Sequence, residues 1–382
     1  MSTIEDYDLR NAFNIERKLL LLCGIYPNEG RINKKLYNLS AFYHISFSLL
    51  ITSSMVIFVA MNMNMNLLSI VEALLFLATQ MAFLCKLFNV LNKKHKLLEI
   101  EDILANPAFY GYPKEKRHFI EDSVRFTKIL GICYRSICAM GFIIYGCFQL
   151  MKDEEWPLPL SGWNPIQVNT KFKYGIIATF QWVAFFMSAY INSGIDILIY
   201  MLISVVTSQF EILKDNLTNI RYETDTAKRD FAKNVVLHYG ILKFVRVIED
   251  TFSYATFFQF FTSVIVICFA GFEIMIAPLN SIQFVSMCTY FSIMIFQVVI
   301  YCWFGHTIIA SSDKINDAIY MSNWYEADLS LKKSIMIFME KCKEPVVLTA
   351  GKICPLSLGT LTNIMRSSYS YLAVLQSIYG QE

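Results

Sequence analysis

The sequence predicts an all-α membrane protein with seven transmembrane helices, the last of them split in two. Of its 382 residues, 55% are apolar and 17% are charged, whereas soluble domains average about 45–50% apolar and about 25% charged residues. Apolar runs of the length that spans a bilayer, about 20 residues, recur along the chain. They cover residues 36–61, 67–91, 124–151, 172–210, 252–277, 281–310 and, on either side of a break at 349–355, residues 334–348 and 356–378.

The first 35 residues contain no predicted span. The run LLLLCGIYP at residues 19–27 is too short to cross a bilayer and lacks the small-residue cleavage site of a signal peptide. We therefore interpret residues 1–35 as a cytoplasmic N-terminus with a short re-entrant or interfacial segment.

Basic residues alternate between the connections. They are frequent before the first span and in the second, fourth and sixth connections, and rare or absent in the others. Lys and Arg favour the cytoplasmic side of a membrane. This pattern predicts a cytoplasmic N-terminus and, after seven crossings, an extracellular C-terminus, which is the reverse of a G-protein-coupled receptor.

The long fourth connection is also predicted to be helical. Apolar residues recur there at spacings of three and four, with charged residues between them, which is the pattern of an amphipathic helix. Such a helix must bury its apolar stripe against its own chain or another subunit. The predicted organisation is a transmembrane bundle at 36–210, a cytoplasmic helical extension at 211–251, two spans at 252–310, a cytoplasmic anchor with the first half of the last helix at 311–348, and the second half with the C-terminus at 349–382.

The chain lacks the residue patterns of an enzyme. There is no GxGxxG, Walker A, HExxH or GxSxG sequence, and the five His and ten Cys residues show no metal-ligand spacing. We expect neither a cofactor nor a metal, and a net charge of +2 gives no sign of nucleic-acid binding. Glu72, Asp196 and Glu273 are isolated intramembrane acids, which are costly in lipid and usually face an interior. Three isolated acids without visible internal repeats disfavour an ion-coupled transporter.

The last span carries a polar stripe. Its members alternate at spacings of three and four and so share one helix face: Thr360, Asn363, Ser367, Ser370, Val374, Ser377 and Gln381. Small polar residues often join membrane helices to each other, which is one interpretation. The other is a water-filled pore lined by one copy of this face per subunit. Val374 and Ile378 would then form a hydrophobic constriction that gates by dewetting.

Three stretches resemble the insect odorant receptor family. They are EPVVLTAGKICPLSLGTLTNIMRSSYSYLAVLQS at 344–377, YCWFGHTIIASSDKINDAIYMSNWYE at 301–326 and QFEILKDNL at 209–217. Gly359 and Lys352 depart from the family's usual residues near the break in the last span. The family's coreceptor is similar in topology but has a much longer insertion between spans four and five, so this chain resembles an odorant-tuning subunit.

The resemblance implies a ligand-gated, non-selective cation channel. Such a subunit is expected to form a heterotetramer with the odorant receptor coreceptor in the plasma membrane, in the dendrites of olfactory sensory neurons. By position, the family's pore constriction falls on Val374 and Ile378, with Ser370 and Ser377 beside them on the pore face.

The resemblance places an odorant pocket in the outer half of spans two, three, four and six. Helical spacing at that depth selects Glu72, Leu75, Phe76, Cys138, Gly141, Tyr145, Phe148, Trp182, Phe186, Tyr190, Met287, Tyr290 and Phe291. Any one of these side chains could instead serve packing alone. A mostly aromatic lining with tyrosine hydroxyls would suit a small neutral volatile, including an aromatic one.

The sequence is also compatible with two other functions. One is a homomeric channel gated by an odorant or tastant without a coreceptor. The other is a seven-span receptor that signals through a soluble partner, and the position of the C-terminus separates it from a channel with the predicted orientation.

Overall fold

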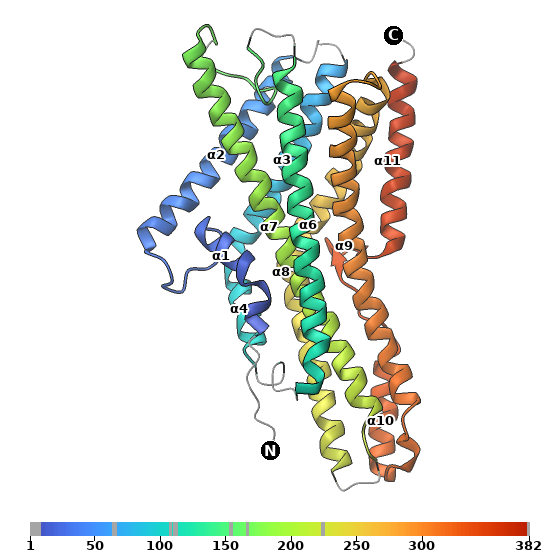
Figure 1. Cartoon of the computed structure of the whole chain (residues 1–382). Helices are drawn as coiled ribbons and strands as arrows, with labels where there is room; N and C mark the ends of the chain where they lie inside the picture. Colours follow the sequence, from blue (N-terminus) through green and yellow to red (C-terminus); the bar gives the residue numbers. More distant parts are fainter. Residues whose placement is uncertain are drawn as a thin grey trace.

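Long helices make up most of the chain (Figure 1). The computed structural model describes residues 9–62, 67–106, 109, 114–152, 156–165, 168–222 and 226–379. Residues 1–8 and 380–382, which belong to the first and last predicted segments, lie outside that part. The elements are η1 (Leu9–Phe13), α1 (Asn14–Leu22), α2 (Lys34–Met61), α3 (Leu67–Asn92), α4 (Lys94–Leu104), η2 (Lys114–Lys116), α6 (Arg117–Leu150), α7 (Lys171–Thr218), α8 (Ala227–Ile276), α9 (Ile282–Tyr320), η3 (Trp324–Glu326), α10 (Leu329–Lys341), β1 (Thr349–Ala350), β2 (Cys354–Pro355) and α11 (Leu358–Tyr379).

Six of these helices are long and apolar enough to cross a membrane, namely α2, α3, α6, α7, α8 and α9. Each of them covers one of the first six predicted spans to within a residue, and α7, α8 and α9 extend well beyond theirs. The second half of the split seventh span corresponds to α11, whose 22 residues carry the polar stripe from Thr360 to Ser377. Figure 1 shows the end of α11 at the same end of the bundle as the turn between α8 and α9, but the direction of insertion stays a prediction.

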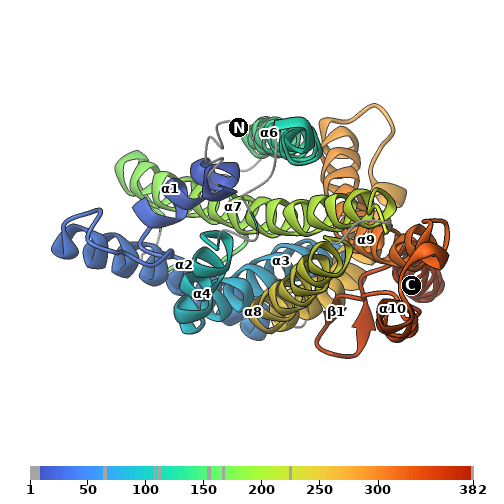
Figure 2. The ribbon, with the colours of Figure 1, turned by 90° about the horizontal axis from the view of Figure 1, so that it is seen from below.

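Helix α7 forms the centre of the bundle. Within its apolar window 83% of the residues are buried, against 17% for α6. Seen from below, α7 runs between α6 on one side and α3 with α8 on the other (Figure 2). The continuous apolar sequence of α7 follows from this position, because a helix surrounded by others needs no polar face. The exposed face of α6 is left for lipid.

The amphipathic fourth connection is helical, as predicted, because α7 and α8 both continue far beyond the spans. Part of their apolar stripe is buried within the chain, where Phe231 and His238 of α8 contact the ring of Phe338 in α10, with centroid distances of 5.6 and 5.1 Å. Val236 and Tyr239 stay exposed on α8. The stripe is thus only partly covered by this chain's own helices.

Helix α9 is longer than predicted. It continues to Tyr320, ten residues past the expected end at residue 310, because Ile315 and Ile319 bury their side chains in the core and keep the helical spacing going. Asp313 and Lys314, directly before Ile315, are charged, so the sequence at this point resembled a connection between spans. Amphipathic turns that pack on neighbours remain helical despite such charges.

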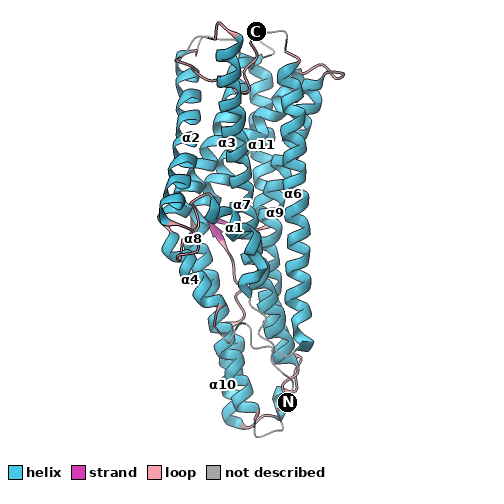
Figure 3. Cartoon of the chain, turned by 60° about the vertical axis from the view of Figure 1, so that its left-hand side comes forward, coloured by secondary structure: helices cyan, strands magenta, loops and turns pink. Residues whose placement is uncertain are grey.

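The last helix is split, as predicted, but the break is wider and contains a hairpin. The first half, α10, ends at Lys341 rather than 348, and α11 begins at Leu358. Between them β1 and β2 pair antiparallel, with Gly351 and Lys352 at φ of 63° and 60°. The hairpin lies part-way along the bundle (Figure 3). Ser253 of α8 holds it, because its carbonyl oxygen accepts from the Gly351 N–H at 2.9 Å and its hydroxyl donates to the Thr349 carbonyl at 2.8 Å.

The short N-terminal run packs on the bundle. Residues 19–22 lie at the end of α1, where Leu20 and Leu21 are buried, and Leu19 and Leu20 lie beside Gly194 of α7. Downstream, the Tyr26 carbonyl accepts from the Tyr37 hydroxyl at 2.9 Å. The run is therefore anchored by α7 and α2, and its re-entrant or interfacial position stays a prediction.

The start of α11 depends on a close approach to α9. A Cβ atom at Gly305 would overlap the Cβ and carbonyl oxygen of Leu356 and lie 2.9 Å from its carbonyl carbon. We expect Gly305→Ala to displace the start of α11 and cost about 1–3 kcal/mol, as overpacking does. Thermal unfolding of the detergent-solubilised protein measures this cost.

Gly175→Ala in α7 is the matched control, since a Cβ there would meet nothing within 4 Å. We expect that variant to unfold at the wild-type temperature or slightly above it, because alanine favours helix over glycine. Equal unfolding temperatures for both variants would show that the α9–α11 contact can relax at no cost.

Candidate functional site

A cavity of about 120 Å³ lies inside the helix bundle. Helices α3, α6, α7, α8 and α9 all contribute to its walls. The residues that line it are Phe76, Thr79, Gln80, Ala82, Phe83, Tyr134, Cys138, Gly141, Phe142, Tyr145, Phe185, Ser188, Ala189, Asn192, Gln259, Thr262, Val266, Ser286, Met287, Tyr290, Ile293, Met294 and Gln297. An apolar cavity of about 150 Å³ can take a benzene ring, so this one has the scale of a single-ring molecule.

Aromatic rings form much of the wall. Phe76 of α3 lies 4.9 Å from Tyr145 of α6 and 5.6 Å from Tyr290 of α9, centroid to centroid. Phe142 and Phe185 lie 5.6 Å apart beside them. Such contacts add to the energy of burial and fix the rings in place. The wall is therefore a preformed apolar surface, as small-molecule sites usually are.

The three tyrosine hydroxyls of the cavity lining already have protein partners. The hydroxyl of Tyr134 is hydrogen-bonded to Cys138. Tyr145 donates to the Pro159 carbonyl at 2.9 Å and accepts from Gln149 at 2.5 Å. The hydroxyl of Tyr290 bonds to Thr79. These hydroxyls thus hold α6 and α9 in position, and the free polar groups of the cavity have to be sought elsewhere.

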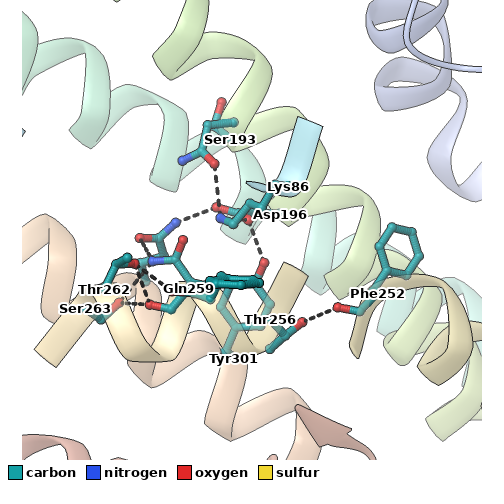
Figure 4. Close-up of polar contacts among 12 residues, drawn as sticks. Lys86, Ser193, Asp196, Phe252, Thr256, Gln259, Thr262, Ser263 and Tyr301 are labelled. Carbon is teal, nitrogen blue, oxygen red and sulfur yellow. Dashed lines mark hydrogen bonds and ion pairs between the residues drawn. The ribbon is translucent and has the colours of Figure 1, made fainter. Parts of the chain in front are cut away.

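A buried polar network forms one end of the cavity (Figure 4). The Lys86 ammonium of α3 lies 2.6 Å from Asp196 of α7, and both side chains are fully buried. Asp196 also accepts from Tyr301 at 2.6 Å and from Gln297 at 2.5 Å, both of α9. A buried charge pair tolerates its desolvation only when further hydrogen bonds satisfy it, and this one has them.

The network continues into α8. Gln259 donates from Nε2 to Gln297 Oε1 at 2.9 Å and to Ser263 Oγ at 3.0 Å. On the α7 side, Asn192 Oδ1 accepts from Lys86 at 3.0 Å. Asn192, Gln259 and Gln297 all line the cavity. Four helices therefore meet in hydrogen bonds at this end of the cavity.

Helix α11 lies on the far side of α8 and α9 from the cavity. Ser368 donates to the Val264 carbonyl of α8 at 3.2 Å, and Leu372 lies against Gly271 of the same helix, within 3.2 Å of a Cβ placed there. The polar stripe lies beside these contacts rather than within them, and Ser370 and Ser377 are exposed. Val374 is 57% and Ile378 49% exposed, and both border a groove between α8 and α11.

A family model described as "7tm Odorant receptor" matches residues 66–369, which is most of the chain. The chain belongs to the odorant receptor family. It is 25% identical to odorant receptor Or1 of Anopheles gambiae over 98% of this chain and 97% of that receptor. It is 23% identical to odorant receptor 94a of Drosophila melanogaster, over 78% of this chain and 79% of that receptor.

The fold is also that of solved odorant receptors. The structure of the insect olfactory receptor OR5 from Machilis hrabei in complex with eugenol superposes with a TM-score of 0.86 at 14% identity, covering 97% of each chain. The structure of OR5 described without eugenol gives a TM-score of 0.83 over the same share. These matches confirm the predicted seven-helix membrane fold of an odorant receptor. The family is not an enzyme family, as predicted.

The odorant receptor cavity brings together only some of the residues selected from the sequence. Those that line it are Phe76, Cys138, Gly141, Tyr145, Met287 and Tyr290. Gly141 has a clear structural reason, because a Cβ there would lie 2.7 Å from Ile293 of α9. Glycine at this position lets α6 and α9 approach beside the cavity.

The other selected residues lie outside the cavity lining. Leu75 and Phe148 are buried in the core, and Glu72 pairs with Lys152 at 3.2 Å. Trp182 packs behind the wall with its ring centroid 4.9 Å from that of Phe142. The three remaining residues are Phe291, which is half-buried, and Phe186 and Tyr190, which are 43% and 38% exposed.

Sequence reasoning missed the contribution of α8 and the polar end of the cavity. Gln259, Thr262 and Val266 come from the fifth span, which was not assigned to the pocket. Lys86 was the available signal, because a lysine within an apolar span needs a partner. Pairing it with Asp196 would have pointed to Asn192, one turn away on the same face of α7.

Proposed function

We propose that this odorant receptor is the tuning subunit of an odorant-gated, non-selective cation channel formed with the odorant receptor coreceptor. A small neutral volatile binds in the cavity and opens a pore lined by α11. The observation that carries this proposal is the position of α8, which forms a wall of the cavity on one side and contacts α11 on the other. Val266 lines the cavity, and Val264, two residues away, bonds to Ser368.

Coupling follows from this shared helix. An odorant that binds the cavity more tightly when α8 and α9 shift outward stabilises the shifted state. The odorant can favour channel opening only by this difference in affinity between the two states. Movement of α8 carries α11 with it through Ser368 and Leu372. The constriction at Val374 and Ile378 then widens and admits water.

Assembly follows from what a single chain leaves exposed. One α11 cannot enclose a pore, so its polar face requires copies from other subunits. Large apolar residues are exposed at the opposite end of the bundle, on α8, α9 and α10, and apolar surface outside the membrane calls for a partner. We infer that this end is the cytoplasmic anchor of a heterotetramer in the plasma membrane of olfactory sensory neuron dendrites.

Expression of the chain with and without the coreceptor tests the proposal. We expect single-ring odorants to evoke cation currents only when both proteins are present, and a tag after the last residue to be accessible on intact cells. Equal currents from this chain alone would establish a homomeric channel. Signalling without current, with the tag accessible only after permeabilisation, would establish a receptor that acts through a soluble partner.

A further inference from the structure

We propose that the side-chain amide of Asn192 is a hydrogen-bond donor that selects odorants carrying an oxygen acceptor. This inference rests on the proposed function and adds the chemical class of ligand. It predicts that the cavity prefers a neutral single-ring volatile with a carbonyl, hydroxyl or ether oxygen over the hydrocarbon of the same shape.

The orientation of the Asn192 amide is fixed by chemistry. Its partner is the Lys86 ammonium at 3.0 Å, which has three donors and no acceptor. The amide must therefore turn its oxygen toward Lys86. The NH₂ group is the remaining polar end of a half-buried side chain that lines the cavity, and among the residues described it has no hydrogen-bond partner.

Lys86 cannot easily turn away from Asn192. It is fully buried and bound to Asp196 at 2.6 Å, and Asp196 is held in turn by Tyr301 and Gln297. Moving the ammonium would leave a buried carboxylate without its counter-charge, which is strongly unfavourable. The ion pair is thus a positioning device for Asn192, and it presents the donor before any ligand arrives.

The other amides of the cavity already donate to protein oxygens. Gln80 donates to Ser188 at 3.3 Å, Gln297 to Asp196 at 2.5 Å, and Gln259 to both Gln297 and Ser263. Asn192 differs because its oxygen has a partner and its NH₂ group does not. An apolar ligand would leave this donor unpaired in a closed site, whereas an oxygen acceptor would pair it.

Matched odorants separate this inference from the function on which it rests. The test uses the full chain expressed with the coreceptor, and acetophenone, benzaldehyde and benzyl alcohol against ethylbenzene and toluene. We expect half-maximal concentrations about tenfold or more lower for the oxygenated members, since pairing a buried donor has an effect of this order. Equal ranking of the two groups would overturn the inference alone, whereas no current to any member, with both proteins at the surface, would overturn both.

Variants identify the donor. Asn192→Leu and Asn192→Ala both remove the amide, the first with a side chain of similar volume and the second with a shorter one. We expect each to raise the half-maximal concentration of oxygenated odorants about tenfold or more and to leave that of the hydrocarbons within about twofold. Asn219→Ala, a change of the same kind at the exposed C-cap residue of α7, should leave every response as in the wild type.

The currents evoked by hydrocarbon odorants also control for folding. A variant that still gives these currents has folded and assembled with the coreceptor. Equal shifts for oxygenated and hydrocarbon odorants in both Asn192 variants would contradict the assignment. If neither variant reaches the surface, the wild-type ranking of the matched pairs still decides whether the cavity prefers an oxygen acceptor.

Discussion

Lys86→Met is expected to destabilise the protein by about 3–5 kcal/mol and to remove most of it from the cell surface. The substitution deletes the counter-charge of Asp196, a carboxylate that is fully buried among four helices. Breaking one partner of a buried ion pair carries a cost of this size because the other charge stays in the low-dielectric interior. Surface labelling and thermal unfolding in detergent measure the effect.

The double variant Lys86→Met with Asp196→Asn separates charge from packing. Asparagine removes the uncompensated charge and can still bond to Tyr301 and Gln297, which now surround Asp196. We expect the double variant to recover at least half of the stability that Lys86→Met loses. A single variant as stable as the wild type would show that water reaches Asp196 and that the pair contributes little.

Val374→Ser is expected to raise the basal current of the complex with the coreceptor about tenfold. In the proposed closed state Val374 helps to keep water out of the pore, and replacing it by serine removes about 1.5 kcal/mol of apolar contact that the open state lacks. Whole-cell recording without odorant measures this current. The ion selectivity and block of the channel should change as well, because the new hydroxyl lines the narrowest part.

Ala373→Ser is the matched control for this experiment. Ala373 is exposed on α11 one residue from Val374 but lies off the polar stripe. We expect its basal current to equal that of the wild type. Identical basal current, block and rectification for Val374→Ser and Ala373→Ser would mean that Val374 does not line the pore.

Much of the fold could be predicted from the sequence because membrane helices are dictated by hydropathy. A bilayer leaves no unpaired backbone groups, so every long apolar run must be helical. The split in the last helix was equally predictable, since Gly351 and Pro355 both disfavour helix. The hairpin between them was not, because it depends on Ser253, a residue about 100 positions away that binds its backbone.

The cavity could be predicted only in part because hydropathy does not fix the rotation of a helix. Spacing along α7 selected Phe186 and Tyr190, which lie on its half-exposed side, whereas the lining residues are Phe185, Ser188, Ala189 and Asn192. Choosing Phe186 instead of Phe185 moves the predicted face about 100° around the helix axis, because successive residues of an α-helix are separated by that angle. A polar signal was more informative than the aromatic one, since Lys86 and Asp196 had to face each other.

The polar stripe of α11 illustrates the opposite case. Its spacing selected residues that are exposed, since Ser370, Val374 and Ser377 are exposed while Ile364 and Ser368 are buried, although Tyr369 and Ala373 off the stripe are exposed as well. The pore itself belongs to an assembly, so its assignment to this face of α11 stays a proposal.

The central claim is that an odorant in the cavity of this chain opens a pore at Val374 and Ile378. The most direct measurement is the structure of the complex with the coreceptor, at an odorant concentration that gives maximal current. We expect ligand density between Phe76, Tyr290 and Asn192, and side chains at Val374 and Ile378 farther from the pore axis than without odorant. Ligand density only in the groove between α8 and α11, or an unchanged constriction with the cavity filled, would contradict the account.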